Sequence, residues 1–354
     1  MRGMTQEVVM KQQKVEKQKV SGTAQTVRNT VKSSETVMGD NTTNTSCSAQ
    51  FSADALMEVL EPVIYVPIFI VGLLLNVAAL LVFCVCLRKW TESTIYMTSL
   101  ALMDLLLLLP LPSKMHAAKN LWSSELRPLC SFLENLYFVG TYGSIYMITC
   151  IAVDRWGAIC HPFRAKQLRS PRAALVTCVG VWLLVFSTIF PVTYNFRQGE
   201  KEPFRCFHEF SEKGWSAAVI SCVLLFGFLG PATVVVLCSV HTIRALQQSG
   251  QTSPKSRACV KIISSSLVAF LVPFTPSHLG VFLQFLVHQK VIQDCGAKDK
   301  ISLFLQVTMC LSNITCCLDA LCYYFIAHEV RSTKHTIRRS MSGQRRATFS
   351  SSEV

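Results

Sequence analysis

The sequence predicts an all-α membrane protein, a seven-transmembrane helix bundle with a short amphipathic helix after span seven. Of its 354 residues, 51% are hydrophobic and only 16% are charged, a composition typical of membrane proteins. Long apolar segments alternate with short basic loops along most of the chain. Because a backbone inside lipid must satisfy its own hydrogen bonds, apolar segments of this length are expected to form helices.

Seven segments are long enough to cross a bilayer, which takes about 20 apolar residues. Four contain no Asp, Glu, Lys or Arg: residues 63–87, 173–196, 215–240 and 262–287. Three carry isolated charges: one around Asp104, one over 130–159, and one over 301–327 with Asp319. The chain is therefore expected to have three regions: a disordered, glycosylated extracellular N-terminus over 1–60, a seven-transmembrane domain over 61–327, and helix eight with a cytoplasmic tail over 328–354.

Basic residues in the loops predict the orientation of the bundle. They follow span one, separate spans three and four and spans five and six, and follow span seven: Arg88, Lys89, Arg164, Lys166, Arg169, Arg172, Arg244, Lys255, Arg257, Lys261, Arg331, Lys334, Arg338 and Arg339. The positive-inside rule places these loops in the cytoplasm, next to membrane lipids, in a multi-pass protein. The N-terminus is then outside, where the sequons at Asn41 and Asn44 can receive glycans. The net charge of +13 is mostly this orientation signal and gives little support for nucleic-acid binding.

This orientation leaves four of the 16 cysteines on the oxidising outer side: Cys47, Cys130, Cys206 and Cys295. Four cysteines allow three pairings, and four free thiols are the alternative. We favour a Cys130–Cys206 disulfide, which would tether the second outer loop to the top of span three. That pairing leaves Cys47 to bond with Cys295.

Single polar, aromatic and proline residues stand at particular places in the spans. They are Asn76, Leu100-Ala101-x-x-Asp104, Trp122, Cys130, Asp154-Arg155-Trp156, Trp182, Pro231, Pro276 and Tyr323. In this order and spacing they resemble the rhodopsin-like (class A) family of G-protein-coupled receptors. Within that family, residues 133–139, 278–287 and 316–325 resemble receptors for lysophosphatidylinositol, and residues 168–172 resemble kynurenate-responsive receptors.

Three positions depart from the pattern of the family. Trp156 stands where tyrosine is usual, Phe274 where tryptophan is usual, and Ala320 where proline is expected. The missing proline puts the usual kink of span seven in doubt, because proline removes a helical hydrogen bond.

The resemblance implies an activation switch in the inner part of the bundle. The charge of Arg155 is expected to pair with Asp154 at rest and to become available to a G protein on activation; snorkelling to the headgroups is the alternative. Pro276 is expected to kink span six, with Phe274 repacking when ligand arrives. Tyr323 belongs to the same switch in span seven.

Asp104 and Asp319 are ionisable residues inside spans, where such groups are rare and usually functional. The resemblance implies that Asp104, Ser144 and Asp319 coordinate an allosteric sodium ion that holds the inactive state; no other cofactor is expected. In the alternative, one acid is protonated and donates a hydrogen bond to the other, because two adjacent buried carboxylates rarely both ionise.

Candidate ligand-binding residues lie in the outer third of the bundle. Lys114 is about 15 Å further out than the acid of span two by helical rise, and the resemblance implies that it binds an anionic headgroup. Snorkelling, or a salt bridge with Glu134, is the alternative. Glu134, Tyr137, Thr141 and Ser144 recur at helical spacing and form one face. An acyl chain needs a largely apolar lining, for which we name His278, Phe282, Phe285 and Met309.

The resemblance implies a plasma-membrane receptor that is not an enzyme. A lysophospholipid, in the first place lysophosphatidylinositol, would activate heterotrimeric G proteins of the twelve/thirteen class, with Gq as a second class, and signal to Rho. The alternatives are a receptor for another small anion, such as kynurenate or lysophosphatidic acid, and a membrane transporter. Against a transporter, the sequence has no internal repeat and no paired broken spans.

The C-terminal tail contains short motifs for regulation. Arg338-Arg339-x-x-Ser342 and Arg345-Arg346-Ala347-Thr348 resemble sites of basophilic kinases. Phosphorylation there would create an acidic patch for arrestin. The last residues, Ser352-Glu353-Val354, are similar to peptides that add a strand to a PDZ domain.

Overall fold

The computed structural model describes residues 50–87, 90–196, 204–207, 212–248 and 254–320. Within them, seven helical spans are long and apolar enough to cross a membrane: Leu56–Val85, Glu92–Lys119, Ser124–Cys160, Pro171–Thr193, Ala217–Gln248, Ser256–His288 and Cys295–Ala320. The prediction of an all-α bundle with seven spans is therefore confirmed. The amphipathic helix expected after span seven lies outside the described residues, and the region boundaries near residues 60 and 327 stay predictions.

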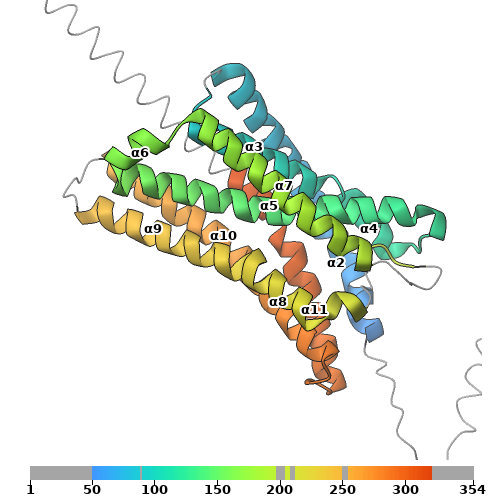
Figure 1. The fold of residues 1–354 in the computed structure, drawn as a ribbon. Coiled ribbons are helices and arrows are strands. Elements are labelled where there is room, and N and C mark those ends of the chain that lie inside the picture. The colour runs from blue at the N-terminus through green and yellow to red at the C-terminus, as the bar shows by residue number, and fades with distance from the viewer. Residues whose placement is uncertain (1–49, 88–89, 197–203, 208–211, 249–253, 321–354) are drawn as a thin grey trace, which may run out of the picture. The chain divides into compact units, whose positions relative to one another are not determined.

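Several spans are built from more than one helix (Figure 1). The first four consist of α2 (Gln50–Leu81) with π-helical η1 (Val82–Leu87), α3 (Glu92–Leu108) with α4 (Leu111–Lys119), η2 (Ser124–Leu126) with α5 (Arg127–Cys160), and α7 (Pro171–Phe196). The short inner helix α6 (Pro162–Leu168) joins α5 to α7, and η3 (Glu212–Trp215) precedes span five. The last three consist of α8 (Ala217–Leu224), η4 (Leu225–Leu229) and α9 (Gly230–Gln248), then α10 (Pro254–His288), then α11 (Cys295–Ser312) with a further turn to Ala320.

Helix α5 is the central element of the bundle. It packs against α3, α7 and α9, and Figure 1 shows it running between them. Helix α11 packs against α10 and α2, which closes the other side of the bundle. Side chains of α5 therefore contact both halves of the bundle.

Pro231 explains the π-helical turn in span five. Proline has no amide hydrogen to give to the preceding turn, and the N–H of Gly230 bonds to the carbonyl of Leu225. The carbonyl of Phe226 is left without a backbone donor at its usual place in the ladder. The hydroxyl of Tyr146 on α5 donates to that carbonyl over 2.9 Å, so the irregular turn is satisfied by a neighbouring helix.

Span seven is irregular even though Ala320 replaces the expected proline. Helix α11 ends at Ser312, and a turn at Asn313 and Ile314 precedes the last helical segment. The side-chain amide of Asn313 donates to the carbonyls of Met309 and Cys310 over 2.8 and 3.2 Å. Because these bonds compete with the regular ladder, asparagine interrupts the helix here without proline.

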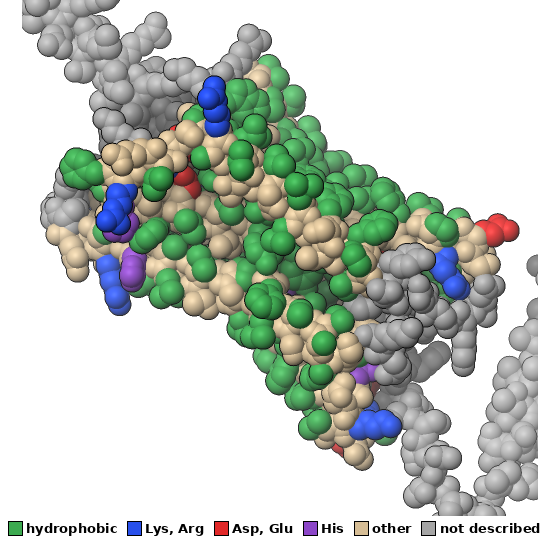
Figure 2. All heavy atoms as spheres, viewed as in Figure 1, with side chains coloured by type: hydrophobic (Ala, Val, Ile, Leu, Met, Phe, Trp, Pro, Cys, Tyr) green, Lys and Arg blue, Asp and Glu red, His purple; other side chains and the backbone are tan. Residues whose placement is uncertain are grey.

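Buried apolar side chains form two clusters within the described bundle. One contains Met103, Ile145 and Phe274, and the other contains Tyr65 and Tyr137. Figure 2 shows apolar side chains across the middle of the visible face, with Lys and Arg side chains toward its two ends. This distribution suits a protein whose middle faces lipid and whose ends face water.

Candidate functional site

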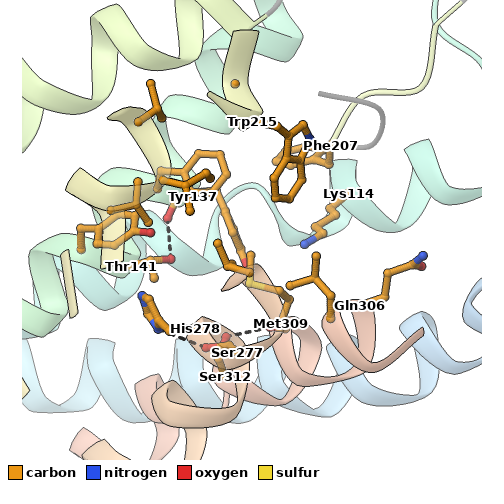
Figure 3. A pocket seen from close by; sticks show the side chains of 18 of the residues that line it. Lys114, Tyr137, Thr141, Phe207, Trp215, Ser277, His278, Gln306, Met309 and Ser312 are labelled. Atoms are coloured by element: carbon orange, nitrogen blue, oxygen red, sulfur yellow. Dashed lines mark hydrogen bonds between the residues drawn. The ribbon is translucent and has the colours of Figure 1, made fainter. Parts of the chain in front are cut away.

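A cavity of about 210 Å³ lies among the helices, lined by residues from α2, α4, α5, α8, α10 and α11 and by Phe207 of the second outer loop (Figure 3). Its wall is mostly aromatic and aliphatic. The charged side chains in the wall are Lys114 and Glu61. An apolar cavity with a few convergent polar groups is the usual form of a ligand site.

Lys114 reaches this cavity because span two breaks at Pro110. Helix α3 ends at Leu108 and α4 begins at Leu111, with Pro110 as its N-cap. The side chain of Lys114 is only 8% exposed, and in Figure 3 its ammonium faces the other lining side chains. The break thus turns a cation inward near the outer end of the span, where the sequence analysis expected it.

Three aromatic rings surround the Lys114 ammonium. Its Nζ lies 4.5 Å from the ring centre of Tyr137, 5.4 Å from that of Tyr65 and 5.8 Å from that of Phe207. Ring faces attract a cation. The opposite charge of Glu61 also attracts it. These contacts, with the side-chain hydrogen bond between Lys114 and Tyr137, offset part of the cost of burying the charge, and the ammonium faces the cavity (Figure 3).

The sequence analysis missed Glu61, Tyr65 and Phe207. Glu61 is the acid nearest to an uncharged span, two residues before it, and this position was a usable signal. It is 2% exposed in the structure. Tyr65 had no signal beyond its place in an apolar run, and Phe207 was hidden in a loop whose path the sequence does not specify.

Helix α5 supplies the face that was expected from residue spacing. Tyr137 and Thr141 both line the cavity, and the Thr141 hydroxyl donates to the Tyr137 carbonyl over 2.9 Å (Figure 3). Met309 of α11 and His278 of α10 line it as well. These four residues lie where a ligand in the cavity would contact them.

Glu134, Phe282 and Phe285 are outside the lining, so the expectation that they form the wall was wrong. Phe282 is 41% exposed. Both Val281 and Phe282 lie within one turn of His278, and the rotation of α10 in the bundle places Val281 in the cavity wall while Phe282 turns outward. Phe285 lies one turn beyond Val281. Glu134 is fully buried and its Oε1 accepts a hydrogen bond from the N–H of Phe207 over 2.9 Å.

His278 connects the cavity to the aromatic core beneath it. Its Nδ1 is 2.8 Å from the carbonyl oxygen of Phe274, and its ring stacks on Phe228 with centres 4.3 Å apart. Phe274 is 1% exposed and packs against Phe270. A ligand that moves His278 would therefore press directly on the ring expected to repack, two residues before Pro276.

Buried acceptors gather deeper in the bundle. The hydroxyl of Ser144 donates to Oδ1 of Asp104 over 2.8 Å. Within the described part of the chain, Asp104 Oδ2, Asp319 Oδ2 and Asn313 Oδ1 have no hydrogen-bond donor. Asp104 and Asp319 interact electrostatically. Unsatisfied buried oxygens are costly, so these groups are suited to share a cation or a proton.

At the inner end, the carboxylate of Asp154 pairs with Arg169, not with Arg155 as expected. Arg169 donates from Nε and a terminal nitrogen to the two carboxylate oxygens over 2.7 and 2.8 Å. Neighbouring residues of a helix point about 100° apart, so Asp154 and Arg155 diverge. The hydrogen bond to Asp154 raises the pKa of Arg169 above its usual value. Arg155 instead lines a small cavity between α5, α9 and α10.

The expected disulfide between Cys130 and Cys206 is present, with Cα atoms 5.8 Å apart. Cys295 is also disulfide-bonded, but Cys47, its expected partner, lies outside the described residues. The same is true of Tyr323, of the sequons at Asn41 and Asn44, and of the tail motifs.

Comparison with known proteins places this arrangement among receptors. Residues 75–323 match the family described as 7 transmembrane receptor (rhodopsin family). The chain is 41% identical to human (Homo sapiens) G-protein coupled receptor 55 over 296 residues, 81% of this chain and 92% of the relative. It is 37% identical to mouse (Mus musculus) G-protein coupled receptor 35, over 74% of this chain and 83% of the relative. Mouse lysophosphatidic acid receptor 4 is 31% identical, over 81% and 79%.

Proposed function

This chain belongs to the rhodopsin family of seven-transmembrane, G-protein-coupled receptors, multi-pass proteins of the plasma membrane that are not enzymes, and we propose that its agonist is an anionic lysophospholipid, lysophosphatidylinositol. Agonist binding would drive a heterotrimeric G protein of the twelve/thirteen class, with Gq as a second class, and so activate Rho. The N-terminus would face the outside of the cell.

The buried ammonium of Lys114 carries this proposal. A cation inside an apolar cavity is costly unless an anion completes its environment. Three rings and Glu61 compensate in part, and the ammonium still faces the cavity. A phosphate group would supply charge-assisted hydrogen bonds there.

The similarity to a receptor named for lysophosphatidic acid supports a phosphate-bearing lipid with one acyl chain. The cavity of about 210 Å³ is smaller than the roughly 300–1,000 Å³ of most ligand sites. It therefore suits a headgroup, with the acyl chain extending beyond it. The same volume favours a second candidate, a compact anion such as kynurenate.

The cytoplasmic side has a surface suited to a G protein. Phe163 on α6 is 89% exposed, and a G protein that binds this side would bury it. Arg155, beside α9 and α10, would contact the same partner once those helices separate. Arrestin and a PDZ protein remain proposed partners of the tail.

A sodium ion is the proposed allosteric partner in the inactive state. Asp104, Ser144, Asp319 and Asn313 supply buried oxygens of the kind that hard cations bind, and three of these oxygens have no donor among the described residues. The ion would offset one of the two negative charges and so stabilise the arrangement of α3, α5 and the last segment of span seven in which these groups meet.

The test is a lysophosphatidylinositol titration with a Rho-activation readout, in cells that lack related receptors. Wild type should respond. Lys114→Ala should shift the response by about tenfold or more, at equal surface expression. Lys119→Ala, which removes an exposed lysine of the same helix, is the matched control and should behave as wild type.

Three outcomes separate the parts of the proposal. Equal responses of wild type and Lys114→Ala would keep the lipid and reject the anchor. A response to kynurenate alone would favour the compact anion. If wild type at the cell surface responds to neither lysophosphatidylinositol nor kynurenate, both ligands are rejected.

A further inference from the structure

Phe207 has a backbone conformation that its residue type rarely adopts. Its φ is 66°, and Lys290 is the other non-glycine residue in the described chain with a positive φ. A left-handed conformation is unfavourable for a bulky L-residue because Cβ approaches the following carbonyl. Such a conformation persists only where surrounding groups hold it in place.

Three anchors hold the segment around Phe207. The preceding residue, Cys206, is bonded to Cys130 at the start of α5. Phe204 and Trp122 exchange backbone hydrogen bonds of 2.8 and 3.2 Å. The third anchor is Glu134, one turn after Cys130, whose Oε1 accepts the N–H of Phe207 itself over 2.9 Å.

Glu134 is the anchor that acts on Phe207 directly. The disulfide and the bridge fix the segment before Phe207, but neither holds the peptide group between Cys206 and Phe207. The fully buried carboxylate of Glu134 accepts the N–H of Phe207 and so fixes the plane of that peptide group. From this fixed plane, the φ of 66° sets the direction of the Phe207 ring.

The conformation of Phe207 decides where its ring lies. The ring is 8% exposed and lines the cavity (Figure 3). Its centre is 5.8 Å from the Lys114 ammonium and 6.1 Å from the ring of Tyr137, which it meets edge-on. The ring therefore forms the wall beside the cation, on the side of the second outer loop.

We propose that Glu134 is a positioning residue: its carboxylate holds the peptide plane between Cys206 and Phe207, and with it the Phe207 ring, which retains a ligand bound at Lys114. The inference rests on the proposed function, in which this cavity is the agonist site. Loss of the carboxylate frees that peptide plane, so that Phe207 can leave its left-handed conformation and turn its ring away from the ammonium. Ligand then leaves faster, whereas its attraction to Lys114 on entry is unchanged.

A first experiment needs no ligand. Hydrogen exchange is measured on purified full-length receptor, in the peptide that contains the Phe207 amide. Glu134→Ala should exchange about tenfold faster there than wild type. Glu134→Gln keeps an oxygen acceptor and should stay close to wild type.

Asn135→Ala is the matched control for general loosening. It removes a different buried hydrogen bond of α5, accepted from Thr193 over 2.7 Å, and should leave exchange at Phe207 unchanged. Equal exchange in Glu134→Ala and wild type would overturn the inference. So would equally fast exchange in Glu134→Ala and Asn135→Ala.

A second experiment follows dissociation of labelled lysophosphatidylinositol. Glu134→Ala and Phe207→Ala should each release it about tenfold faster, with association changed far less. The double variant should be no faster than either single variant, because Glu134 acts through the ring. If the dissociation rate of the double variant rises by the product of the two single effects, Glu134 acts on the ligand independently of Phe207. The positioning role would then be rejected.

The two experiments separate this inference from the proposed function. If wild type does not bind lysophosphatidylinositol, the ligand assignment fails, and the exchange measurement still decides whether Glu134 holds Phe207. If exchange responds to Glu134→Ala while dissociation does not, Phe207 is held as described but does not retain ligand, and the inference fails.

Discussion

The carboxylate of Asp154 and the guanidinium of Arg169 form two parallel hydrogen bonds, of 2.7 and 2.8 Å. Asp154 lies near the C-terminal end of α5, and Arg169 follows α6. The pair therefore fastens the segment between α5 and α7, with the exposed Phe163, to the helix that carries Arg155. Because Arg169 binds both carboxylate oxygens of Asp154, this carboxylate is not available to pair with Arg155.

Arg169→Ala and Asp154→Ala are each expected to destabilise the receptor, by about 1 kcal/mol because the pair is partly exposed. Arg169→Lys should lose much of the same stability, since lysine cannot bond both oxygens in parallel. Thermal unfolding in detergent measures the effect. In the double variant the losses should not add; fully additive losses would mean that the two groups do not stabilise each other.

Gly140 marks a close approach of α5 to the backbone of α3. A Cβ at this position would lie 2.5 Å from the backbone nitrogen of Leu107, and backbone atoms cannot move without shifting the helix. Gly140→Ala should therefore cost about 1–3 kcal/mol of stability through overpacking.

Gly157 on the same helix is the matched control, because a Cβ there meets nothing within 4 Å. Gly157→Ala should be neutral or stabilising, since alanine favours helix over glycine by about 1 kcal/mol. Both variants are compared by thermal unfolding. Equal midpoints would show that α3 and α5 can separate freely at Gly140.

The hydroxyl of Tyr146 replaces the amide hydrogen that Pro231 lacks, by donating to Phe226. Tyr146→Phe should cost about 1 kcal/mol. In a Pro231→Ala background the new N–H gives the helix its own donor, so the same substitution should cost much less. Thermal unfolding is measured for wild type, the two single variants and the double variant. If Tyr146→Phe costs as much stability in the Pro231→Ala background as in wild type, this account is contradicted.

The sequence predicted the seven spans because their length and lack of charge are strong signals. It also placed Lys114 near the outer end of span two, Ser144 near Asp104, and Cys130 opposite Cys206. Each of these depends on position along a span or on the side of the membrane. The depth of Lys114 follows from residue counting, and the outer position of the two cysteines follows from the basic loops. The meeting of Ser144 with Asp104 was implied by the resemblance to the receptor family.

The errors came from contacts that residue counting does not determine. Phe282 and Val281 are adjacent, and only the rotation of α10 in the bundle decides which one faces the cavity. Asp154 pairs with a loop residue fifteen positions later in the chain. Phe207 reaches the cavity because a disulfide and a carboxylate from another segment hold its loop. No local sequence pattern predicts these two contacts.

Sodium should lower agonist affinity, because the ion would bind the inactive arrangement in preference. Replacing choline by sodium at constant ionic strength should weaken lysophosphatidylinositol binding by about five- to tenfold in wild type, within the usual range of allosteric coupling. Asp104→Asn removes a buried anion and should abolish the difference. Ser144→Ala, which removes the donor to Asp104, should reduce it.

The alternative is a proton shared between Asp104 and Asp319, and it makes a different prediction. Binding would then be equal in sodium and choline, and Asp319→Asn would change it little, since an amide can donate as the protonated acid does. Agonist affinity that is indifferent to the cation in wild type would therefore reject the ion and favour the proton.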